Sequence, residues 1–324
     1  MRKKNKMPSE TSRVISVNIS EEKGEMKRPV AAIKLDNRGV SGDAHAGLWH
    51  RQVSLLGQES IDAFAAATGK AVGPGMFAEN ITLAGIDLSH AAILDQFEIG
   101  NTALEVTQIG KQCHGDGCAI FREVGKCVMP KEGIFCRVIR GGSIRPGDNV
   151  DFIPRTLRIL LVTLSDRASA GEYEDRSGPR AMELLGAFFA GKRWHVQIES
   201  ALLPDDAGRL ATTLESAISS GVDAIFTLGS TGIGPRDIAP ETAAPLCNRM
   251  IPGIMEGIRT KYGAEHPAAR LSRSVAGIAG KTQLYTLPGS VRAVEEYLDE
   301  ILKTFEHAVY MLHGLDTHSV QPSR

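Results

Sequence analysis

The sequence lacks the apolar stretches that membrane insertion or export would require. No window approaches the run of about 18 apolar residues expected of a membrane-spanning helix. Residues 1–12 are basic and polar, without the apolar segment of a secretory signal. We therefore expect a cytoplasmic protein with no membrane partner.

An excess of charge of one sign is also lacking. The 324 residues contain 37 Lys and Arg against 38 Asp and Glu, a formal net charge of −1. Nucleic-acid binding usually leaves a basic footprint, which this total does not provide, so we expect no nucleic-acid partner. With 42% hydrophobic and 23% charged residues, the chain has ample material for buried cores, and its length predicts two domains.

Cysteine is scarce but clustered, since four of the five cysteines fall between residues 113 and 136. An odd number in a chain expected to be cytoplasmic favours reduced thiols over a disulfide framework. Two interpretations stay open, a zinc site and simple burial of cysteines in a core. The Cys-x4-Cys spacing of the first differs from the Cys-x2-Cys pairs typical of structural zinc sites. The zinc interpretation uses Cys113, His114, Cys118 and Cys127 with His45 or His50, and the core interpretation applies to Cys118, Cys127 and Cys136.

Residues 13–153 predict a β-barrel or a related β-rich domain. Short β-type runs alternate there with Gly, Pro and Asp. One helix is expected at 58–67, with Gly69 as its stop. The domain boundary should lie near Pro154 and Arg155. The expected strands cover residues 14–19, 52–56, 99–109, 134–139 and 149–153.

A different pattern begins at residues 158–164, a continuous apolar run typical of a strand buried on both faces. Helix and strand signals then alternate, which predicts an α/β domain with three layers around a largely parallel sheet. The expected helices are 178–189, 205–219, 240–261 with an interruption near Pro252, and 291–312, and the further strands are 195–202, 224–228 and 283–287.

Three loops that follow strands deserve notice, because ligands of open α/β sheets bind at that edge. Residues 165–179 lead into a helix for which Ser177 is a natural N-cap, with Pro179 near its first turn. Residues 229–237 (GSTGIGPRD) combine glycines and hydroxyls with Arg236, as a phosphate-binding loop or a tight turn would. They match neither the Walker A sequence, whose Gly-Lys-Ser/Thr ending is missing, nor the dinucleotide-binding pattern Gly-x-Gly-x-x-Gly. Residues 287–290 (LPGS) bring a glycine and a hydroxyl to a helix start, where anions are favoured.

Seven ordered segments within residues 158–314 resemble the molybdopterin adenylyltransferase family of the MogA/MoaB type. One departure is Ser230, where the family usually has the second glycine of Gly-Gly-Thr-Gly. The matching segments are TLSDRAS (163–169), YEDRSGP (173–179), LPD (203–205), GSTGIGPRDIAPET (229–242), MIPG (250–253), LSR (271–273) and LPGS (287–290).

This resemblance implies transfer of AMP from ATP onto the terminal phosphate of molybdopterin, with Mg²⁺ as clamp and pyrophosphate as the second product. Asp205 and Asp237 match the family's functional aspartates, for Mg²⁺ and nucleotide positioning, and Asp166 is a further catalytic candidate. Residue chemistry leaves open that Asp205 is a helix N-cap and that Arg273 is a surface ion pair. The expected substrate contacts are Ser165, Gly229, Ser230, Thr231, Gly232, Arg236, Ser272, Arg273, Pro288, Gly289 and Ser290.

The first half of the chain resembles a MOSC domain, a β-barrel module associated with binding and sulfuration of the molybdenum cofactor. The resemblance makes Cys113 a candidate sulfur carrier or molybdenum ligand, a role that suits a soft thiolate. Arg51 and Lys111 are candidate contacts of the cofactor phosphate. The segments that carry it are GDAH (42–45), WHRQVSL (49–55), GMFAENI (75–81), QIGKQCH (108–114), GIFCRV (133–138) and RPGD (145–148).

Together the two resemblances predict a MOSC-like domain over 13–154 and a molybdopterin adenylyltransferase over 156–314. A non-catalytic carrier of molybdopterin or of the molybdenum cofactor is the alternative, and the presence of both Asp205 and Asp237 favours the enzyme. The resemblance also implies a homo-oligomer, a trimer in this family, that meets other proteins of cofactor biosynthesis or molybdoenzymes.

Overall fold

The computed structural model describes residues 12–111 and 127–316. The chain forms two compact units, a first that ends at Arg155 and resumes at Leu315, and a second of Thr156–Gly314. Within the described ranges, no helix combines the length and the apolar character needed to cross a bilayer.

The first unit is built mainly from eleven short strands. Among the described strands, every pairing is antiparallel except that of β5 with β6. The strands are β1 (Arg13–Ile19), β2 (Arg28–Val30), β3 (Ile33–Asp36), β4 (Gly39–Val40), β5 (Val53–Gly57), β6 (Ile81–Ala84), β7 (Gln96–Ile99), β8 (Thr102–Ile109), β9 (Ile134–Arg140), β10 (Gly142–Ile144) and β11 (Val150–Ile153).

Their order confirms a β-rich unit but not a closed barrel. Eight strands form one sheet in the order β11-β7-β8-β9-β5-β6-β1-β2, and three form another in the order β10-β3-β4. A single isolated bridge, Arg13 with Asn149, joins the start of β1 to the residue before β11. The described strand ladders therefore curl one edge of the sheet toward the other without completing a continuous barrel.

The predicted helix of the first unit is confirmed as α1 (Gln58–Thr68), which ends at Gly69 with φ +68°. Glycine suits this position because a left-handed C-cap strains residues that carry a Cβ. The helix buries Ile61 and Phe64, and the Phe64 ring meets that of Phe77 edge to face at 5.1 Å between centroids. Further helical turns in the described part of this unit are η1 (Leu88–His90) and α3 (Met129–Glu132).

The second unit contains the predicted, largely parallel sheet. Its strands are β12 (Thr156–Leu164), β13 (His195–Leu203), β14 (Ala224–Leu228), β15 (Arg249–Met250), β16 (Ala276–Ala279) and β17 (Thr282–Leu287). They are ordered β13-β12-β14-β17-β16-β15, and the first four are parallel. The antiparallel edge of β16 and β15 was not predicted, since these strands are short and lack a strong alternating pattern.

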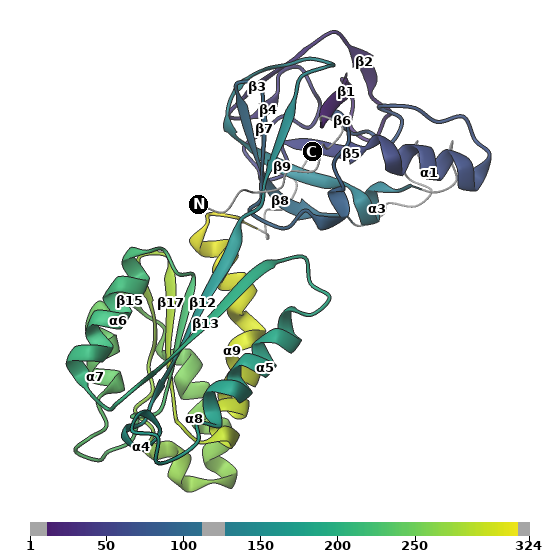
Figure 1. Cartoon of the computed structure of the whole chain (residues 1–324). Helices are drawn as coiled ribbons and strands as arrows, with labels where there is room; N and C mark the ends of the chain where they lie inside the picture. Colours follow the sequence, from purple (N-terminus) through teal and green to yellow (C-terminus); the bar gives the residue numbers. More distant parts are fainter. Residues whose placement is uncertain (1–11, 112–126, 317–324) are drawn as a thin grey trace, which may run out of the picture. The chain divides into compact units, whose positions relative to one another are not determined.

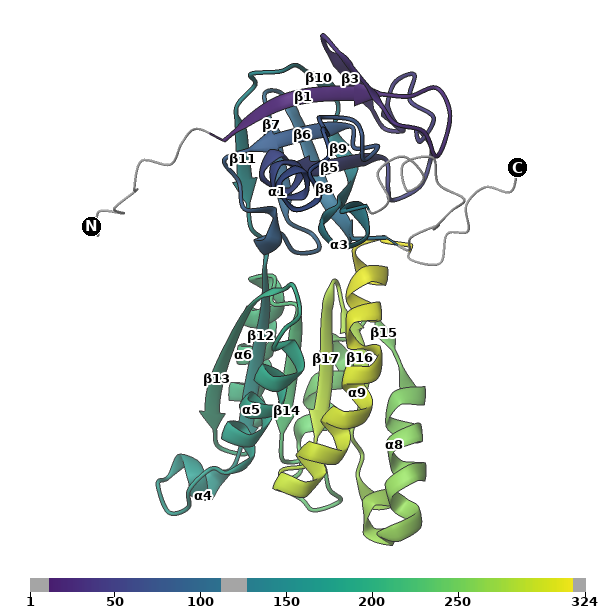
Figure 2. The ribbon, with the colours of Figure 1, turned by 90° about the vertical axis from the view of Figure 1, so that its right-hand side faces the viewer.

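Helices cover both faces of this sheet and complete three layers. Figure 1 shows α6 and α7 on one side and α5 and α9 on the other, and in Figure 2 α5 and α9 lie in front of the strands. The helices are α4 (Asp166–Ser169), α5 (Ser177–Phe189), α6 (Ala207–Ser219), α7 (Ala239–Ala243), η3 (Ala244–Leu246), α8 (Pro252–Glu265), η4 (Pro267–Leu271) and α9 (Val291–Leu312).

The predicted helix 240–261 is broken over more residues than expected. The chain leaves the helix after α7, passes through η3 and β15, and re-enters a helix at Pro252, the first residue of α8. Proline suits a first helical position because no intrahelical partner awaits its missing N–H. The break lets β15 add to the sheet edge.

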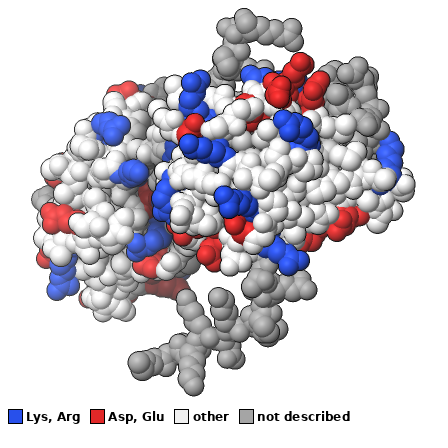
Figure 3. Space-filling model, turned by 90° about the horizontal axis from the view of Figure 1, so that it is seen from above, with Lys and Arg blue, Asp and Glu red and all other residues white. Residues whose placement is uncertain are grey.

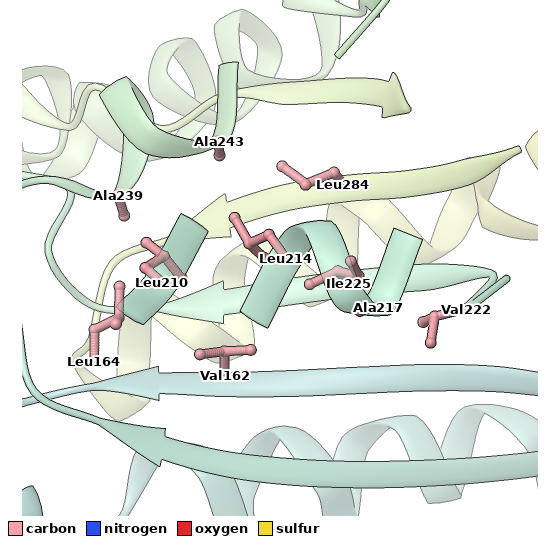
Figure 4. Packing of buried hydrophobic residues seen from close by; sticks show 10 residues of the cluster. All are labelled: Val162, Leu164, Leu210, Leu214, Ala217, Val222, Ile225, Ala239, Ala243 and Leu284. Carbon is pink, nitrogen blue, oxygen red and sulfur yellow. The ribbon is translucent and has the colours of Figure 1, made fainter. Parts of the chain in front are cut away.

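The core under α6 holds the sheet and this helical layer together. Figure 4 shows Leu210, Leu214 and Ala217 of α6 packed above apolar side chains of the strands, beside the two alanines of α7. The strand residues of this cluster are Val162, Leu164, Ile225 and Leu284. Such burial is the dominant stabilising term for a layered fold.

Candidate functional site

The second unit has a topological switch point, since β12 lies between β13, which follows it in the chain, and β14. Ligands of open α/β sheets bind outside the carboxyl ends of the strands at such a point. Asp166 follows β12, Asp205 follows β13 and the loop 229–237 follows β14. The fold therefore brings these predicted site residues to one edge.

The helix-cap interpretation of Asp205 is wrong, because its neighbour takes that role. Asp206 is the N-cap of α6, and its side chain accepts a hydrogen bond from the backbone N–H of Arg209 at 2.9 Å. The backbone N–H of Asp205 donates to Oδ1 of Asp166 at 2.9 Å. The carboxylate of Asp205 therefore does not cap the helix and lies at the switch point, where the side chain is 18% exposed.

Arg236 faces both of these aspartates. Its guanidinium forms an ion pair with Oδ2 of Asp166, and it lies 3.8 Å from Oδ2 of Asp205. The Arg236 side chain is 66% exposed, whereas its backbone carbonyl accepts a hydrogen bond from the Ser230 hydroxyl at 3.0 Å. The backbone at Arg236 is thus anchored while its side chain extends toward solvent.

Burial raises the pKa of Asp205 above its ordinary value, and the charge of Asp237 raises it further, while a hydrogen bond with Ser230 lowers it. Two neighbouring carboxylates disfavour each other's ionised forms. A carboxylate whose charge is disfavoured in this way gains most from a bound cation. The charge of Asp237 therefore acts directly on that of Asp205.

The loop after β14 approaches its neighbours too closely for larger residues. A Cβ on Gly229 would lie 2.5 Å from the carbonyl oxygen of Leu164, at the end of β12. The Gly229 N–H donates to the carbonyl of Leu287 at 2.8 Å, so this residue also ties β14 to the end of β17. Ser230 adopts a φ of +57°, a conformation that favours glycine. This explains physically why glycine suits the one position that departs from the family pattern.

Asp237 closes the same loop. Its Oδ2 accepts a hydrogen bond from the backbone N–H of Gly234 at 2.8 Å. A Cβ on Gly232 would lie 2.7 Å from this oxygen, so a larger residue there would require the Asp237 carboxylate to shift. Thr231 is buried, whereas Ile233 at the tip is 70% exposed.

Arg273 braces this loop in addition to forming the ion pair that was left open for it. Its Nε donates to the carbonyl of Gly232 at 2.5 Å, and one terminal nitrogen donates to the carbonyl of Asp237 at 2.9 Å. The other terminal nitrogen pairs with Glu241, and the backbone N–H donates to Thr231. The guanidinium therefore holds two loop carbonyls as well as its ion-pair partner, and its predicted contact with the pterin stays a prediction.

The remaining predicted hydroxyls lie at helix starts or between helices. Ser165 caps α4 and Ser290 caps α9, each through its side-chain oxygen. The Ser272 hydroxyl is 2.8 Å from that of Ser274 and accepts a hydrogen bond from the Tyr297 hydroxyl at 3.0 Å. Pro288 and Gly289 join β17 to α9, and a Cβ on Gly289 would lie 3.0 Å from the Cα of Gly229. The loops after β14 and β17 thus touch.

Ser177 is not the N-cap of α5 as predicted. It is the first residue of that helix, and Arg176 is the N-cap residue, without a hydrogen bond from its side chain. Oδ1 of Asp175 accepts hydrogen bonds from the backbone N–H groups of Ser177 and Gly178, at 2.9 and 3.1 Å, and from the Ser177 hydroxyl. Asp175, one residue before the N-cap, thus binds the first free N–H groups of α5 although it is not itself the cap residue.

The first unit contains a buried charge cluster that the sequence analysis only partly found. Lys27 and Asp43 form an ion pair in which each side chain is 1% exposed, and the Nδ1 atom of His45 lies 3.3 Å from Asp43 Oδ1. Oδ2 of Asp43 also accepts from Asn80 Nδ2 at 3.1 Å and from the Ser20 N–H at 3.2 Å. Asp43 and His45 lie in the GDAH segment, whereas Lys27 gave no signal in the sequence.

The pKa values of this cluster follow from burial and pairing. Burial raises the pKa of Asp43, but the hydrogen bond with His45 and the charge of Lys27 outweigh it, so that the net pKa lies well below the ordinary value. Burial lowers the pKa of Lys27 more than Asp43 raises it. Asp43 therefore stays ionised and serves as the anchor of the cluster.

Arg51 is half-buried against aromatic rings. Its guanidinium carbon lies 4.8 Å from the Trp49 ring centroid and 5.9 Å from that of Phe135, and burial lowers its pKa. Its Nε is buried and has no hydrogen-bond partner among residues 12–111 and 127–316.

The cysteine cluster is described only in part. Cys113, Cys118 and His114 lie outside the described residues, so the roles predicted for them stay predictions. Cys136 is fully buried, and burial raises the pKa of its thiol, as expected for a core residue.

Comparison with known proteins agrees with this geometry. Residues 160–307 match the probable molybdopterin binding domain family, and residues 42–151 match the MOSC domain. The chain is 35% identical to a molybdopterin adenylyltransferase from Pyrococcus furiosus over 164 residues, which cover 48% of this chain and 93% of that protein. This chain belongs to the MogA/MoaB family of molybdopterin-binding proteins through its second unit and carries a MOSC domain in its first. Both resemblances are confirmed.

Two further similarities concern the same half of the chain. A molybdenum cofactor biosynthesis bifunctional protein from Chlorobaculum tepidum is 35% identical over 170 residues, which cover 52% of this chain and about half (51%) of that relative. A crystal structure of a molybdopterin biosynthesis protein from Mycobacterium abscessus is 34% identical, with a TM-score of 0.43, and the match covers 49% of this chain and 95% of that one.

Proposed function

We propose that the second unit is a molybdopterin adenylyltransferase, which transfers AMP from ATP to the terminal phosphate of molybdopterin. The observation that carries this proposal is the convergence of Asp166, Asp205 and the loop 229–237 at one switch point. The Pyrococcus relative, which is named for this activity, supports the choice of reaction.

This reaction depends more on neutralising the negative charges of the two substrates than on proton transfer. A phosphate oxygen of molybdopterin forms a bond to the α-phosphorus of ATP, and the bond from that phosphorus to the oxygen bridging to the β-phosphate breaks. The electron pair leaves with pyrophosphate. A phosphate monoester has its second pKa near 6, so at neutral pH the attacking oxygen mostly carries no proton and needs no general base. Catalysis then depends on positioning two anions and neutralising them.

The residues at the switch point fit Mg²⁺, which prefers carboxylate oxygens and substrate phosphates. Asp205 and Asp237 would hold the ion, with Asp166 beside them. The raised pKa of Asp205 supports this assignment, because it means that the ionised carboxylate is disfavoured without a nearby cation. When bound, Mg²⁺ would neutralise charge on the phosphates and orient them.

Substrate phosphates and the pterin would be held by the loops of the same edge. Backbone N–H groups of a glycine-rich loop and of helix starts are natural partners of phosphate oxygens. We assign that role to the loops after β12, β14 and β17. The residues are Ser165, Gly229, Ser230, Thr231, Gly232 and Arg236, with Ser272, Arg273, Pro288, Gly289 and Ser290 on the neighbouring strand ends.

For the MOSC unit, we propose that it binds or sulfurates the cofactor that the second unit activates. Cys113 would carry the sulfur or ligate molybdenum, and Arg51 would meet the cofactor phosphate, which the unpartnered Nε supports. The functional domains would span 13–154 and 156–314. The protein would act in the cytoplasm as a homo-oligomer, a trimer by analogy with its family.

The experiment incubates purified protein with molybdopterin, ATP and Mg²⁺ and detects adenylylated molybdopterin by mass. Asp237→Asn is the comparison variant. Product formed by the wild type and lost in Asp237→Asn would support both the activity and the role of Asp237. Binding of molybdopterin without AMP transfer would refute the activity and support a carrier.

A further inference from the structure

Carboxylates outnumber cations at the switch point. Asp166, Asp205 and Asp237 lie together there, and the charge of Asp237 acts on Asp205. In the described part of the site, Arg236 is the cation that pairs with Asp166 and lies near Asp205. Three carboxylates against one guanidinium leave about two negative charges, which matches a divalent cation.

The two arginines of the loop differ in how firmly they are held. Arg273 is bound to the carbonyls of Gly232 and Asp237 and to Glu241, and its side chain is 35% exposed. Arg236 pairs with carboxylates alone, and its side chain is 66% exposed. A long exposed side chain loses little by leaving an ion pair. Arg273 therefore shapes the loop, whereas Arg236 can change partners.

We propose that Arg236 is an exchangeable counter-ion. Without metal and nucleotide, its guanidinium neutralises Asp166 and Asp205 and thereby reduces the repulsion between the carboxylates at the switch point. When a metal ion is held by Asp205 and Asp237, its charge beside Asp166 would release the guanidinium, which would then turn to the phosphates of ATP. This inference rests on the proposed function and adds that Arg236 links metal binding to nucleotide binding.

The exchange has a signature that a purely structural role lacks. Arg236 competes with the metal for the carboxylates, so its removal strengthens metal binding in the absence of nucleotide. The same side chain attracts the triphosphate, so its removal weakens ATP binding. If Arg236 only maintained the shape of the loop, its removal would weaken both metal binding and ATP binding.

The test uses the full chain and Mn²⁺, a hard cation that prefers oxygen ligands and is visible by electron paramagnetic resonance. For Arg236→Gln, we expect Mn²⁺ without nucleotide to bind about 10-fold more tightly, and ATP with Mg²⁺ to bind about 10-fold more weakly, as one exposed charge pair allows. Arg236→Lys keeps the charge and should fall between. Arg140→Gln, which breaks an exposed pair with Glu98 in the other unit, is the matched control and should change neither.

Unchanged or weaker Mn²⁺ binding by Arg236→Gln would overturn the exchange, as would a wild type that binds no Mn²⁺. A circular dichroism spectrum and Tm equal to those of the wild type verify that the variant is folded, and Arg236→Lys provides the comparison if it is not. The proposed function is judged separately by product mass. If the wild type forms adenylylated molybdopterin but Arg236→Gln binds Mn²⁺ as the wild type does, the exchange is refuted and the proposed function stands.

Discussion

The two units each hold aspartates against a basic side chain, but they bury them differently. In the first unit Lys27 and Asp43 are sealed from solvent, and Asn80, Ser20 and His45 satisfy the carboxylate. In the second unit Arg236 and Asp166 are 66% and 36% exposed. Desolvation makes it costly to remove either partner of the first pair, since a lone buried charge is unfavourable. Solvent leaves the second pair free to exchange partners, which binding chemistry requires.

Figure 3 shows that such exposed charges of both signs are intermixed on the face it displays. Most of them are screened by solvent and contribute little to stability. Burial, rather than the presence of an ion pair, therefore decides which pairs matter for folding.

The largest effect should come from breaking the buried pair. Asp43→Asn leaves Lys27 buried without its counter-charge and should lower the free energy of unfolding of the first unit by about 3–5 kcal/mol. Urea unfolding followed by Trp49 fluorescence measures this in a Trp194→Phe background, because the chain has only 2 tryptophans. Glu98→Gln, which breaks the exposed pair with Arg140, is the control and should cost less than about 1 kcal/mol.

Acid should destabilise the same cluster. The pKa of Asp43 is lower in the folded than in the unfolded chain, so its stabilisation is complete above the ordinary value of 3.8 and is lost as the pH falls below it toward the folded value. Below that pH, the stability difference between wild type and Asp43→Asn should shrink. A difference independent of pH from neutral to strongly acidic solution would contradict the pairing.

Asp205→Asn should produce the opposite result, a loss of activity without a loss of stability. Its pKa is raised in the fold, so the ionised form is disfavoured there, and Asn should leave the free energy of unfolding equal or higher. The rate of AMP transfer should fall at least about 100-fold, because metal clamping supplies several kcal/mol. A lower Tm together with retained AMP transfer would show that Asp205 is structural.

A smaller effect is expected from loosening the loop. Arg273→Ala removes the hydrogen bonds to the carbonyls of Gly232 and Asp237 and should slow AMP transfer by about 10- to 100-fold through misplacement of the loop. Glu241→Gln keeps those two bonds and should change the rate only a few-fold, as its pair with Arg273 is partly exposed. Equal losses in the two variants would show that the ion pair, not the brace, positions the loop. Steady-state kinetics with ATP measure both.

The smallest effect concerns the strained position of the same loop. Ser230→Ala and Ser230→Gly both lose the hydroxyl that binds the Ile238 N–H and the Arg236 carbonyl. They differ in the backbone, because alanine keeps the unfavourable φ of +57° whereas glycine relieves it. Thermal unfolding should show Ser230→Gly more stable than Ser230→Ala by about 1 kcal/mol. Equal stability of the two variants would mean that this φ costs nothing.

Local sequence signals were sufficient for most of the second unit. The apolar run of β12 and the exact extents of β14 and α9 depend on neighbours in the chain, as does the glycine stop after α1 in the first unit. The approximate placement of Asp166, Asp205 and the glycine loop at one edge also followed, because the carboxyl ends of parallel strands meet there. Even so, side-chain partners that lie far apart in the sequence could not be assigned.

What the sequence determined by itself is therefore the series of elements, the motifs and the family that they resemble. The tertiary structure decided that Asp206 rather than Asp205 caps α6, that Arg273 braces the loop, and that Lys27 is sealed against Asp43. The physical reason is that element type follows local periodicity and capping, whereas burial and pairing depend on contacts across many residues. A charge acquires its role only from the solvent and the partners that the fold leaves beside it.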